Sequence, residues 1–403
     1  MKSCCHKIMK PSILFVTTSS NWPLTDGKRQ RTWFLIEALS EKFSVDLLLI
    51  GYPADKNQIE KSTNSIYRLF FFDLSNSNLP DIGYPKFLIS KKQKSNTNFN
   101  LKQLQLFFFE LNQKHHYSFV FSRYLWPLLI LDLPKEIKVM CDIDDVYIEA
   151  QQSRIQKETN FSSKLKLQIL FMLGTIKVKK LLKRIDIPII VKESDRLFYG
   201  LKKAVCLPNI PFGYYIDTKA SKKNDFVFPA EIVKFGFIGK LSYRPNYQGL
   251  IDFINKVWNP LINNKSEARL VIAGSGKMPI ILKNNILASK NIDVIGFVET
   301  ADEFWNQIST LIVPIAEGAG SNIKIAEAFI YGKTIIAHPF ASRGYESFID
   351  SDYLLLPKTN EDWIKTMTNI EVPTPNQSKL LSAKAKELFD LEHWNQILLN
   401  TVS

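Results

Sequence analysis

The stretch PIAEGAGSNIKIAEAFIYG, residues 314–332, decides the fold of this chain. The apolar run 311–313 leads into it as a strand, the small residues of 316–320 form a loop, and apolar side chains from Ile323 onward recur at helical spacing. Gly332 stands where the glycine that ends a helix belongs. A strand, a glycine loop and a helix in this order are typical of a doubly wound α/β domain, whose ligand lies beyond the carboxyl ends of its strands.

The loop in this stretch suits a diphosphate. Glycines let the backbone approach an anion closely, and the free N–H groups of a helix N-terminus hold the anion together with the helix dipole. Lys324 adds positive charge, and Glu327, one turn further on, is placed to accept hydrogen bonds from ribose hydroxyls. The residues expected to bind such a ligand are Gly318, Ala319, Gly320, Ser321, Asn322, Ile323 and Lys324. The alternative is a core helix on which Lys324 and Glu327 merely pair at the surface, and the strand and loop around them favour the binding site.

Strands and helices alternate through both halves of the chain. Strands are predicted at 13–17, 45–50, 67–72, 119–122, 139–141, 188–191 and 205–207, and then at 233–238, 269–273, 294–297, 311–314 and 334–337. Short apolar strands separated by helices predict parallel sheets that are covered on both faces. Thr300 and Glu303 form a predicted capping box. The polar segments 91–100 and 211–229 are predicted to be a loop and an inter-domain linker.

The segment GAGSNIKIAEA, followed by a glycine and the apolar run TIIA, resembles the donor-binding signature of family-4 retaining glycosyltransferases. This resemblance implies the GT-B fold, in which two Rossmann-like doubly wound domains face each other across a cleft. It also implies that Glu327 grips the nucleoside ribose of a nucleotide-diphosphate sugar, while the loop amides bind its phosphates. Such enzymes generally need no metal ion or other cofactor, because basic side chains and helix amides neutralise the diphosphate.

Two further segments resemble the same family. FGFIGKLSYRPNYQ, residues 235–248, is similar to the strand, glycine and basic loop that open the family's C-terminal domain. Gly239 and Lys240 then stand where that loop approaches the donor diphosphate. LVIAGSGK, residues 270–277, is similar to the next strand and its glycine turn.

The chain departs from the family pattern at two positions. The first of two glutamates common in the family corresponds to Ala319, and the usual loop lysine corresponds to Pro245, so that neighbouring Arg244 is expected to supply the charge. Lys240, Arg244 and Glu327 are the predicted catalytic residues. The two cations are expected to stabilise the charge that develops on the departing diphosphate.

The first half resembles the family more loosely. PLTDGKRQR, residues 23–31, is similar to the glycine loop that leads into the family's first helix, so Gly27 is expected near the donor phosphate and Arg31 near the acceptor. Arg123 and Tyr124 follow a predicted strand and are expected to face the acceptor.

The acidic run CDIDDV, residues 141–146, allows three interpretations. Its carboxylates suit magnesium, a helix cap at Asp144 or Asp145 is favoured over a metal, and one of them can orient an acceptor hydroxyl. Asp144 is therefore included in the predicted acceptor site, and no metal ligand is assigned.

Composition and length point to a two-domain enzyme. The chain has 403 residues, more than one ordinary hydrophobic core accommodates. Of these, 45% are hydrophobic and 23% are charged, as is usual for a globular enzyme. Its 52 basic and 39 acidic residues give a net charge of +13, which favours anionic ligands, but no aromatic and basic nucleic-acid module is present, so no nucleic-acid partner is expected. Cys4, Cys5, Cys141 and Cys206 fit neither a zinc site nor a disulfide framework, and a cytoplasmic location is predicted.

The basic segment 163–184 predicts a long, partly amphipathic helix. Two interpretations stay open for it: a solvated helix face, or a surface that lies against the anionic lipid of the inner membrane face as in a peripheral protein.

The predicted organisation has three parts: an acceptor-binding domain at 1–210, a nucleotide-sugar-binding domain at 211–385, and a helix at 386–403 that crosses back to the first domain. The predicted activity is that of a retaining hexosyltransferase acting on a glycan or lipid-linked acceptor, as in surface polysaccharide or glycoconjugate synthesis. Two alternatives stay open: a sugar-nucleotide epimerase on the same fold, and a non-catalytic basic protein that binds nucleic acid or a membrane.

Overall fold

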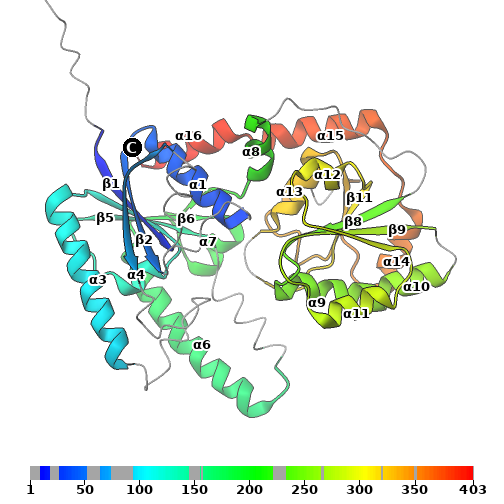
Figure 1. The fold of residues 1–403 in the computed structure, drawn as a ribbon, viewed down its shortest axis with the longest axis horizontal. Coiled ribbons are helices and arrows are strands. Elements are labelled where there is room, and N and C mark those ends of the chain that lie inside the picture. The colour runs from blue at the N-terminus through cyan, green and yellow to red at the C-terminus, as the bar shows by residue number, and fades with distance from the viewer. Residues whose placement is uncertain are drawn as a thin grey trace, which may run out of the picture. The chain divides into compact units, whose positions relative to one another are not determined.

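The computed structural model describes residues 10–18, 27–51, 64–73, 94–144, 155, 158–220, 233–264, 267–318, 321–348 and 352–402. The chain divides into two compact units (Figure 1). Unit 1 comprises Met1–Pro208 and His393–Ser403, and unit 2 comprises Asn209–Glu392.

Unit 1 contains a sheet of parallel strands in the order β3-β2-β1-β4-β5-β6-β7. Its strands are β1 (Ser12–Thr18), β2 (Ser44–Gly51), β3 (Ile66–Asp73), β4 (Phe119–Arg123), β5 (Lys138–Ile143), β6 (Ile187–Ile190) and β7 (Val205–Cys206). Its helices are α1 (Gly27–Ser40), α3 (Lys94–His115), α4 (Pro127–Ile130), α6 (Phe161–Leu182), α7 (Glu193–Tyr199) and most of α16 (Leu391–Thr401). Strand β2 is buried at every position after Ser44, as expected for a parallel strand with both faces covered.

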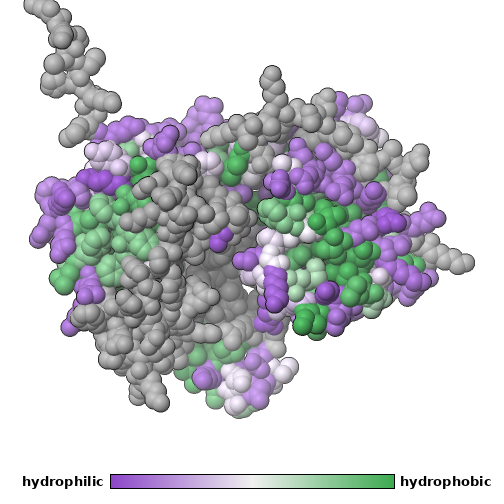
Figure 2. Space-filling model, viewed as in Figure 1, coloured by the Kyte–Doolittle hydropathy of each residue, from purple (hydrophilic) through white to green (hydrophobic). Residues whose placement is uncertain are grey.

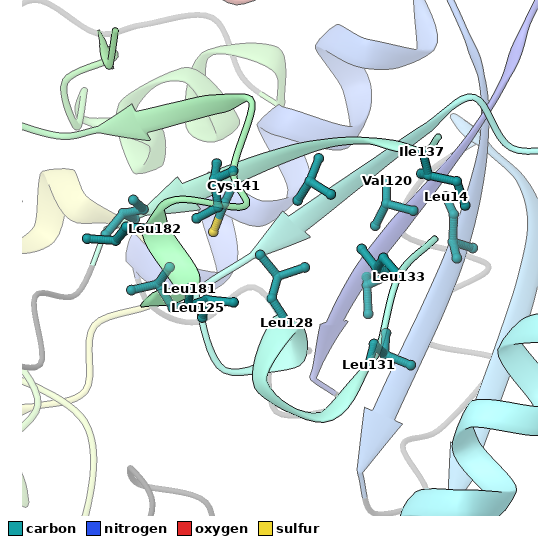
Figure 3. Packing of buried hydrophobic residues seen from close by; sticks show 14 of the residues in the cluster. Leu14, Val120, Leu125, Leu128, Leu131, Leu133, Ile137, Cys141, Leu181 and Leu182 are labelled. Atoms are coloured by element: carbon teal, nitrogen blue, oxygen red, sulfur yellow. The ribbon is translucent and has the colours of Figure 1, made fainter. Parts of the chain in front are cut away.

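The core of unit 1 lies between its sheet and the surrounding helices. Figure 3 shows Leu125 and Leu128, which follow β4, close to Leu181 and Leu182 at the end of α6. Cys141 of β5 lies in the same cluster and is fully buried. The last turns of α6 are therefore fixed by apolar packing against the sheet.

Unit 2 contains a second parallel sheet, in the order β10-β9-β8-β11-β12-β13. Its strands are β8 (Lys234–Ile238), β9 (Arg269–Ala273), β10 (Ile292–Gly296), β11 (Thr310–Val313), β12 (Thr334–Ala337) and β13 (Leu354–Leu355). Its helices are α8 (Phe212–Ala220), α9 (Arg244–Phe253), α10 (Asn259–Asn263), α11 (Ile280–Leu287), α12 (Ala301–Trp305), α13 (Ile323–Ile330), α14 (Asn360–Asn369) and α15 (Pro375–Leu388). A π-helical turn, Ile254–Trp258, joins α9 to α10.

Two predicted helix boundaries of unit 2 are confirmed. Glu303 accepts a hydrogen bond from the backbone N–H of Thr300 at 3.2 Å, which completes the capping box of α12. Gly332 follows Tyr331, the C-cap of α13, and has a φ of +62°, a conformation that glycine adopts without strain.

Two predicted irregular segments are wrong in part. Segment 91–100 was expected to be a loop, but α3 begins at Lys94, because Leu104 and Phe108 bury one face of a helix whose polar first turns continue it upstream. The predicted linker 211–229 begins with α8, whose Phe212 is fully buried. In both segments, tertiary packing outweighs local polarity.

Candidate active site

Two predicted donor loops of unit 2 follow neighbouring strands. Strands β8 and β11 pair in register, with Thr310 opposite Phe235, and the strand order reverses between them. The loop after β8 begins at Gly239, and the loop after β11 runs through Gly318. Parallel strands end at the same edge of a sheet, so both loops lie at the switch point where doubly wound domains bind ligands.

The first loop is tightly packed against its neighbour after β9. The backbone N–H of Gly239 donates to Ala273 at 3.2 Å, and that of Leu241 donates to Ser275 at 2.8 Å. A Cβ atom on Gly274, whose φ is +153°, would lie 1.8 Å from the carbonyl oxygen of Gly239. Only glycine fits this position, and the close approach holds the backbone after β8 in one conformation.

The two loops also approach each other. A Cβ atom on Gly318, whose φ is +126°, would lie 3.5 Å from Tyr243 Oη and 3.5 Å from Pro245 Cγ. The guanidinium of Arg244 lies 3.7 Å from the carboxylate of Glu317, with the arginine side chain 60% exposed and the glutamate side chain 12% exposed. Arg244 is thus held at the edge of the loop and remains accessible to solvent.

Lys324 reaches from α13 across to the loop after β8. Its Nζ donates to Asn246 Oδ1 at 3.4 Å and lies 4.3 Å from the ring centre of Phe237. The same Asn246 donates through Nδ2 to the carbonyl oxygen of Lys240 at 2.9 Å. Burial lowers the pKa of Lys324 to about 7, although nearby Glu327 raises it in part.

The start of α13 is braced from three directions. Asn209 Nδ2 donates to Ser321 Oγ at 3.0 Å, and Tyr345 Oη donates to the carbonyl oxygen of Asn322 at 3.0 Å. Asn322 Nδ2 in turn donates to the carbonyl oxygen of Ala341 at 3.0 Å. Burial raises the pKa of Tyr345 far above its ordinary value, so this residue stays a neutral hydrogen-bond donor. The backbone amides at the helix start are therefore held in place.

The remaining predicted donor residues take up defined positions. Ile323 is the first residue of α13, Glu327 is half-buried one turn after Lys324, and Lys240 is exposed. Ala319 and Gly320 lie outside the described residues.

In unit 1 the predicted acceptor residues form a buried ionic cluster at the carboxyl ends of β4 and β5. Arg31 of α1 donates to both carboxylate oxygens of Asp142, at 2.9 Å each. Arg123 donates to Asp142 at 2.6 Å and to Asp144 at 2.7 Å. Both arginines and Asp142 are fully buried, and Asp144 nearly so. The cluster thus joins α1 to the ends of two neighbouring strands.

The cluster also contacts both segments of unit 1, at the end of the first segment and at the start of the second. Arg31 donates to the carbonyl oxygens of Leu207 at 3.0 Å and Pro208 at 3.1 Å, and its guanidinium lies 5.6 Å from the ring centre of Trp394. The indole of Trp394 donates to Pro208 at 2.8 Å. Arg31 and Arg123 are therefore positioning residues in this structure, and an acceptor contact by either stays a prediction.

Tyr124 and Gly27 are close in sequence to the two arginines of this cluster. Tyr124 follows Arg123, and Gly27 lies in the same helix as Arg31. Tyr124 has a φ of +71°, uncommon for a residue with a side chain, and the guanidinium of Arg123 lies 4.2 Å from its ring centre. Gly27 is the first residue of α1 and is half-buried. Asp145, the other candidate helix cap, lies outside the described residues.

No group of three or more histidine, cysteine, aspartate or glutamate side chains that could hold a metal ion occurs among the described residues. The expectation that donor binding needs no metal stays a prediction.

Residues 233–370 match the sequence profile of glycosyl transferases group 1. Unit 2 carries a group 1 glycosyltransferase domain. The match covers β8 to α14, and so includes both loops at the switch point. A search of curated protein sequences finds no significant relative of this chain.

Solved structures share the fold of the whole chain. Sucrose-phosphate synthase from Thermosynechococcus elongatus is 13% identical with a TM-score of 0.65, and 97% of each chain is covered. Anabaena HepE, solved in complex with UDP and glucose, is 12% identical with a TM-score of 0.60, covering 97% of this chain and 99% of the other. A protein from Listeria monocytogenes assigned as a UDP-N-acetylglucosamine 2-epimerase is 11% identical with a TM-score of 0.56, covering 98% and 96%. The chain therefore has the GT-B fold, with two parallel-sheet α/β domains.

Several residues that shape these sites were not singled out by the sequence analysis. Asn209, Asn246, Tyr345 and Trp394 all form hydrogen bonds with residues distant in sequence. Asn246 lies inside segment 235–248, so its place beside the basic loop is a sequence signal for a residue that shapes the site. For Tyr345 and Trp394 the sequence offers none, because an aromatic residue alone does not show where its polar atom points.

Proposed function

We propose that this chain is a glycosyltransferase that binds a nucleotide-diphosphate sugar at the edge of unit 2 where β8 and β11 end. The observation that carries this proposal is the position of Lys324, whose half-buried side chain reaches from the start of α13 to the loop after β8. A partly desolvated lysine beside backbone amides and a helix N-terminus forms a strong site for a diphosphate. Glu327, one turn further along α13, would bind the ribose hydroxyls.

In the proposed reaction, the bond between the sugar and the diphosphate breaks with retention at the anomeric carbon. Lys240 and Arg244 would stabilise the negative charge on the leaving diphosphate, together with the amides at the start of α13. Arg244 now pairs with Glu317 at 3.7 Å, a long and exposed contact that a phosphate can replace. No pair of glycosidase-like carboxylates is required.

The acceptor is proposed to be a glycan or lipid-linked hydroxyl compound bound by unit 1. Tyr124 is half-buried beside the buried cluster of Arg123, Asp142 and Asp144. This cluster would hold Tyr124 in position to contact the acceptor. The group transferred is proposed to be a hexosyl group, as in the synthesis of a surface polysaccharide or glycoconjugate.

Donor binding is tested by thermal shift with UDP, GDP, ADP and their common sugar conjugates, without metal and then with magnesium. A ligand that binds the native state raises its melting temperature by mass action. We expect a selective shift with one nucleotide, and its loss in Glu327→Ala. If all these ligands leave the melting temperature of the folded protein unchanged, the donor assignment is wrong.

Product analysis separates transfer from epimerisation, which the fold also supports in the Listeria protein assigned as an epimerase. With donor alone, an epimerase yields the epimeric sugar nucleotide as its net product. A transferase releases the nucleotide and needs an acceptor or water to do so. Conversion of the intact sugar nucleotide without release would contradict the proposed function.

A further inference from the structure

We infer that α6 docks unit 1 onto an anionic lipid surface through an exposed apolar stripe bordered by lysines. This inference goes beyond the proposed function and does not rest on it. No described helix is long and apolar enough to cross a membrane.

The stripe consists of large apolar side chains on the outer face of α6, exposed to between 47% (Leu165) and 81% (Phe161). Its members are Phe161, Leu165, Ile169, Met172, Leu173 and Ile176. Successive members are one, three or four residues apart, which places all six within an arc of about 120° on the helix. A monomeric soluble protein rarely leaves so continuous an apolar row on its surface.

The stripe is separate from the face by which α6 packs into unit 1. Val178, Leu181 and Leu182 are buried in the core, and on the helix they point roughly opposite to the stripe. In Figure 1 the end of α6 that carries Leu182 lies by the sheet of unit 1, and the rest of the helix extends away from that sheet. Apolar residues reach the surface in the part of Figure 2 where Figure 1 places α6. Core packing therefore explains only the last turns of this apolar helix.

The charge of α6 is entirely positive. Between Glu158 and Asp186 the sequence has no acidic residue. Exposed Lys166 and Lys177 border the stripe along one side, and the exposed lysines beyond its end are Lys179, Lys180 and Lys183. Basic side chains beside a row of leucine, isoleucine and phenylalanine are the composition of helices that lie in the headgroup region of anionic membranes.

This charge favours lipid over a second copy of the chain. Two identical helices that pair through the stripe would bring their lysines together, with no acidic residue on either helix to offset the repulsion. An anionic bilayer offers negative charge across its whole surface and an apolar layer for the side chains beneath it.

The test is sedimentation of the full chain with vesicles of phosphatidylcholine alone and of phosphatidylcholine mixed with phosphatidylglycerol. We expect binding to the mixed vesicles only, weakened by salt. In the stripe variant L165Q/I169Q/L173Q/I176Q, affinity should fall by more than about tenfold. Replacing Lys166, Lys177 and Lys180 by glutamine should reduce affinity by roughly fivefold for each lysine.

The matched control is I280Q/L287Q on α11, which removes exposed apolar side chains from unit 2. All changed side chains are exposed, so melting temperatures should stay close to that of the parent chain, which shows that each variant folds. The control should bind vesicles like the parent chain.

Three results would overturn the inference. The first is equal binding of the parent chain to neutral and anionic vesicles. The second is an equal loss of binding in the α11 control. The third is absence of vesicle binding together with a dimer in size-exclusion chromatography that the stripe variant dissociates, because the stripe would then be a contact between two copies.

Discussion

Asn246 accepts a hydrogen bond from Lys324 Nζ at 3.4 Å while it donates to the carbonyl oxygen of Lys240 at 2.9 Å. One side-chain amide thus joins the helix after β11 to the loop after β8. It offers Lys324 a neutral partner, and burial is left as the main influence on the lysine, lowering its pKa to about 7. A bound diphosphate would supply the missing negative charge.

We therefore predict that donor binding takes up a proton above pH about 7. The bound diphosphate favours the charged form of Lys324, so the donor Kd should rise with pH above this value, by up to about tenfold per pH unit. Calorimetry in two buffers of different ionisation enthalpy measures the proton uptake. Lys324→Met should bind donor more weakly and lose the uptake, and an uptake that persists in this variant would assign the proton to another group.

The same shift predicts how Lys324 affects stability. Its pKa of about 7 in the folded chain is below the ordinary value of 10.5, so the unfolded chain binds more protons between these two values. Stability should therefore rise with pH across this window, and Lys324→Met should reduce the slope. Urea unfolding at several pH values measures it.

The bond from Asn209 to Ser321 predicts a coupled pair in the proposed donor site. Asn209→Ala and Ser321→Ala should each weaken donor binding by roughly fivefold, the usual value of one hydrogen bond, because the start of α13 loses a brace. The double variant should be no weaker than Ser321→Ala alone, since that change already removes the bond to Asn209.

Tyr345→Phe is the companion variant, because it removes a different brace, the bond to Asn322. Its effect should add to that of Asn209→Ala. Full additivity between Asn209→Ala and Ser321→Ala in a donor titration would show that their bond does not hold the loop.

Sequence patterns predict the strands well because the strands of parallel sheets are short, apolar and bounded by turns. The run VDLLLI at 45–50 lies within β2, and TIIA at 334–337 is β12 itself. Helix starts are harder to predict, since the polar first turns of α3 look like a loop until the packing of Phe108 is known.

The candidate site also has a part that the sequence predicts and a part that it does not. Glycine loops and the charged residues beside them are local patterns, and the two predicted donor loops follow neighbouring strands in the structure. The partners of Arg31 and Arg123 depend on side chains from three separate elements, α1, β4 and the end of β5. Arg31 and Arg123 were expected to face an acceptor, and they are buried against aspartates. Sequence spacing does not show such long-range pairing, so these partners could not be predicted.

The ionic cluster of unit 1 predicts a large stability effect at one carboxylate. Asp142→Asn leaves two fully buried arginines with too little negative charge, and it should lower the free energy of unfolding by about 3–5 kcal/mol. The control is Asp132→Asn, whose ion pair with Arg184 is exposed and should contribute less than about 1 kcal/mol. Urea denaturation of both variants measures the difference, and equal effects would show that burial of the cluster does not matter.

The last prediction separates backbone conformation from close packing at two glycines of unit 2. Gly274 and Gly296 both have positive φ, +153° and +74°, so alanine strains the backbone at either position. At Gly296 the added Cβ meets nothing within 4 Å, and we expect a loss of about 1 kcal/mol. At Gly274 the Cβ would lie 1.8 Å from the carbonyl oxygen of Gly239, so the backbone after β8 has to move. Gly274→Ala should therefore cost several-fold more stability and also weaken donor binding, while Gly296→Ala should leave donor binding intact. If Gly274→Ala binds donor as tightly as the parent chain, the conformation of the loop at Gly239 and Lys240 does not control donor affinity, and these two residues lose their proposed role.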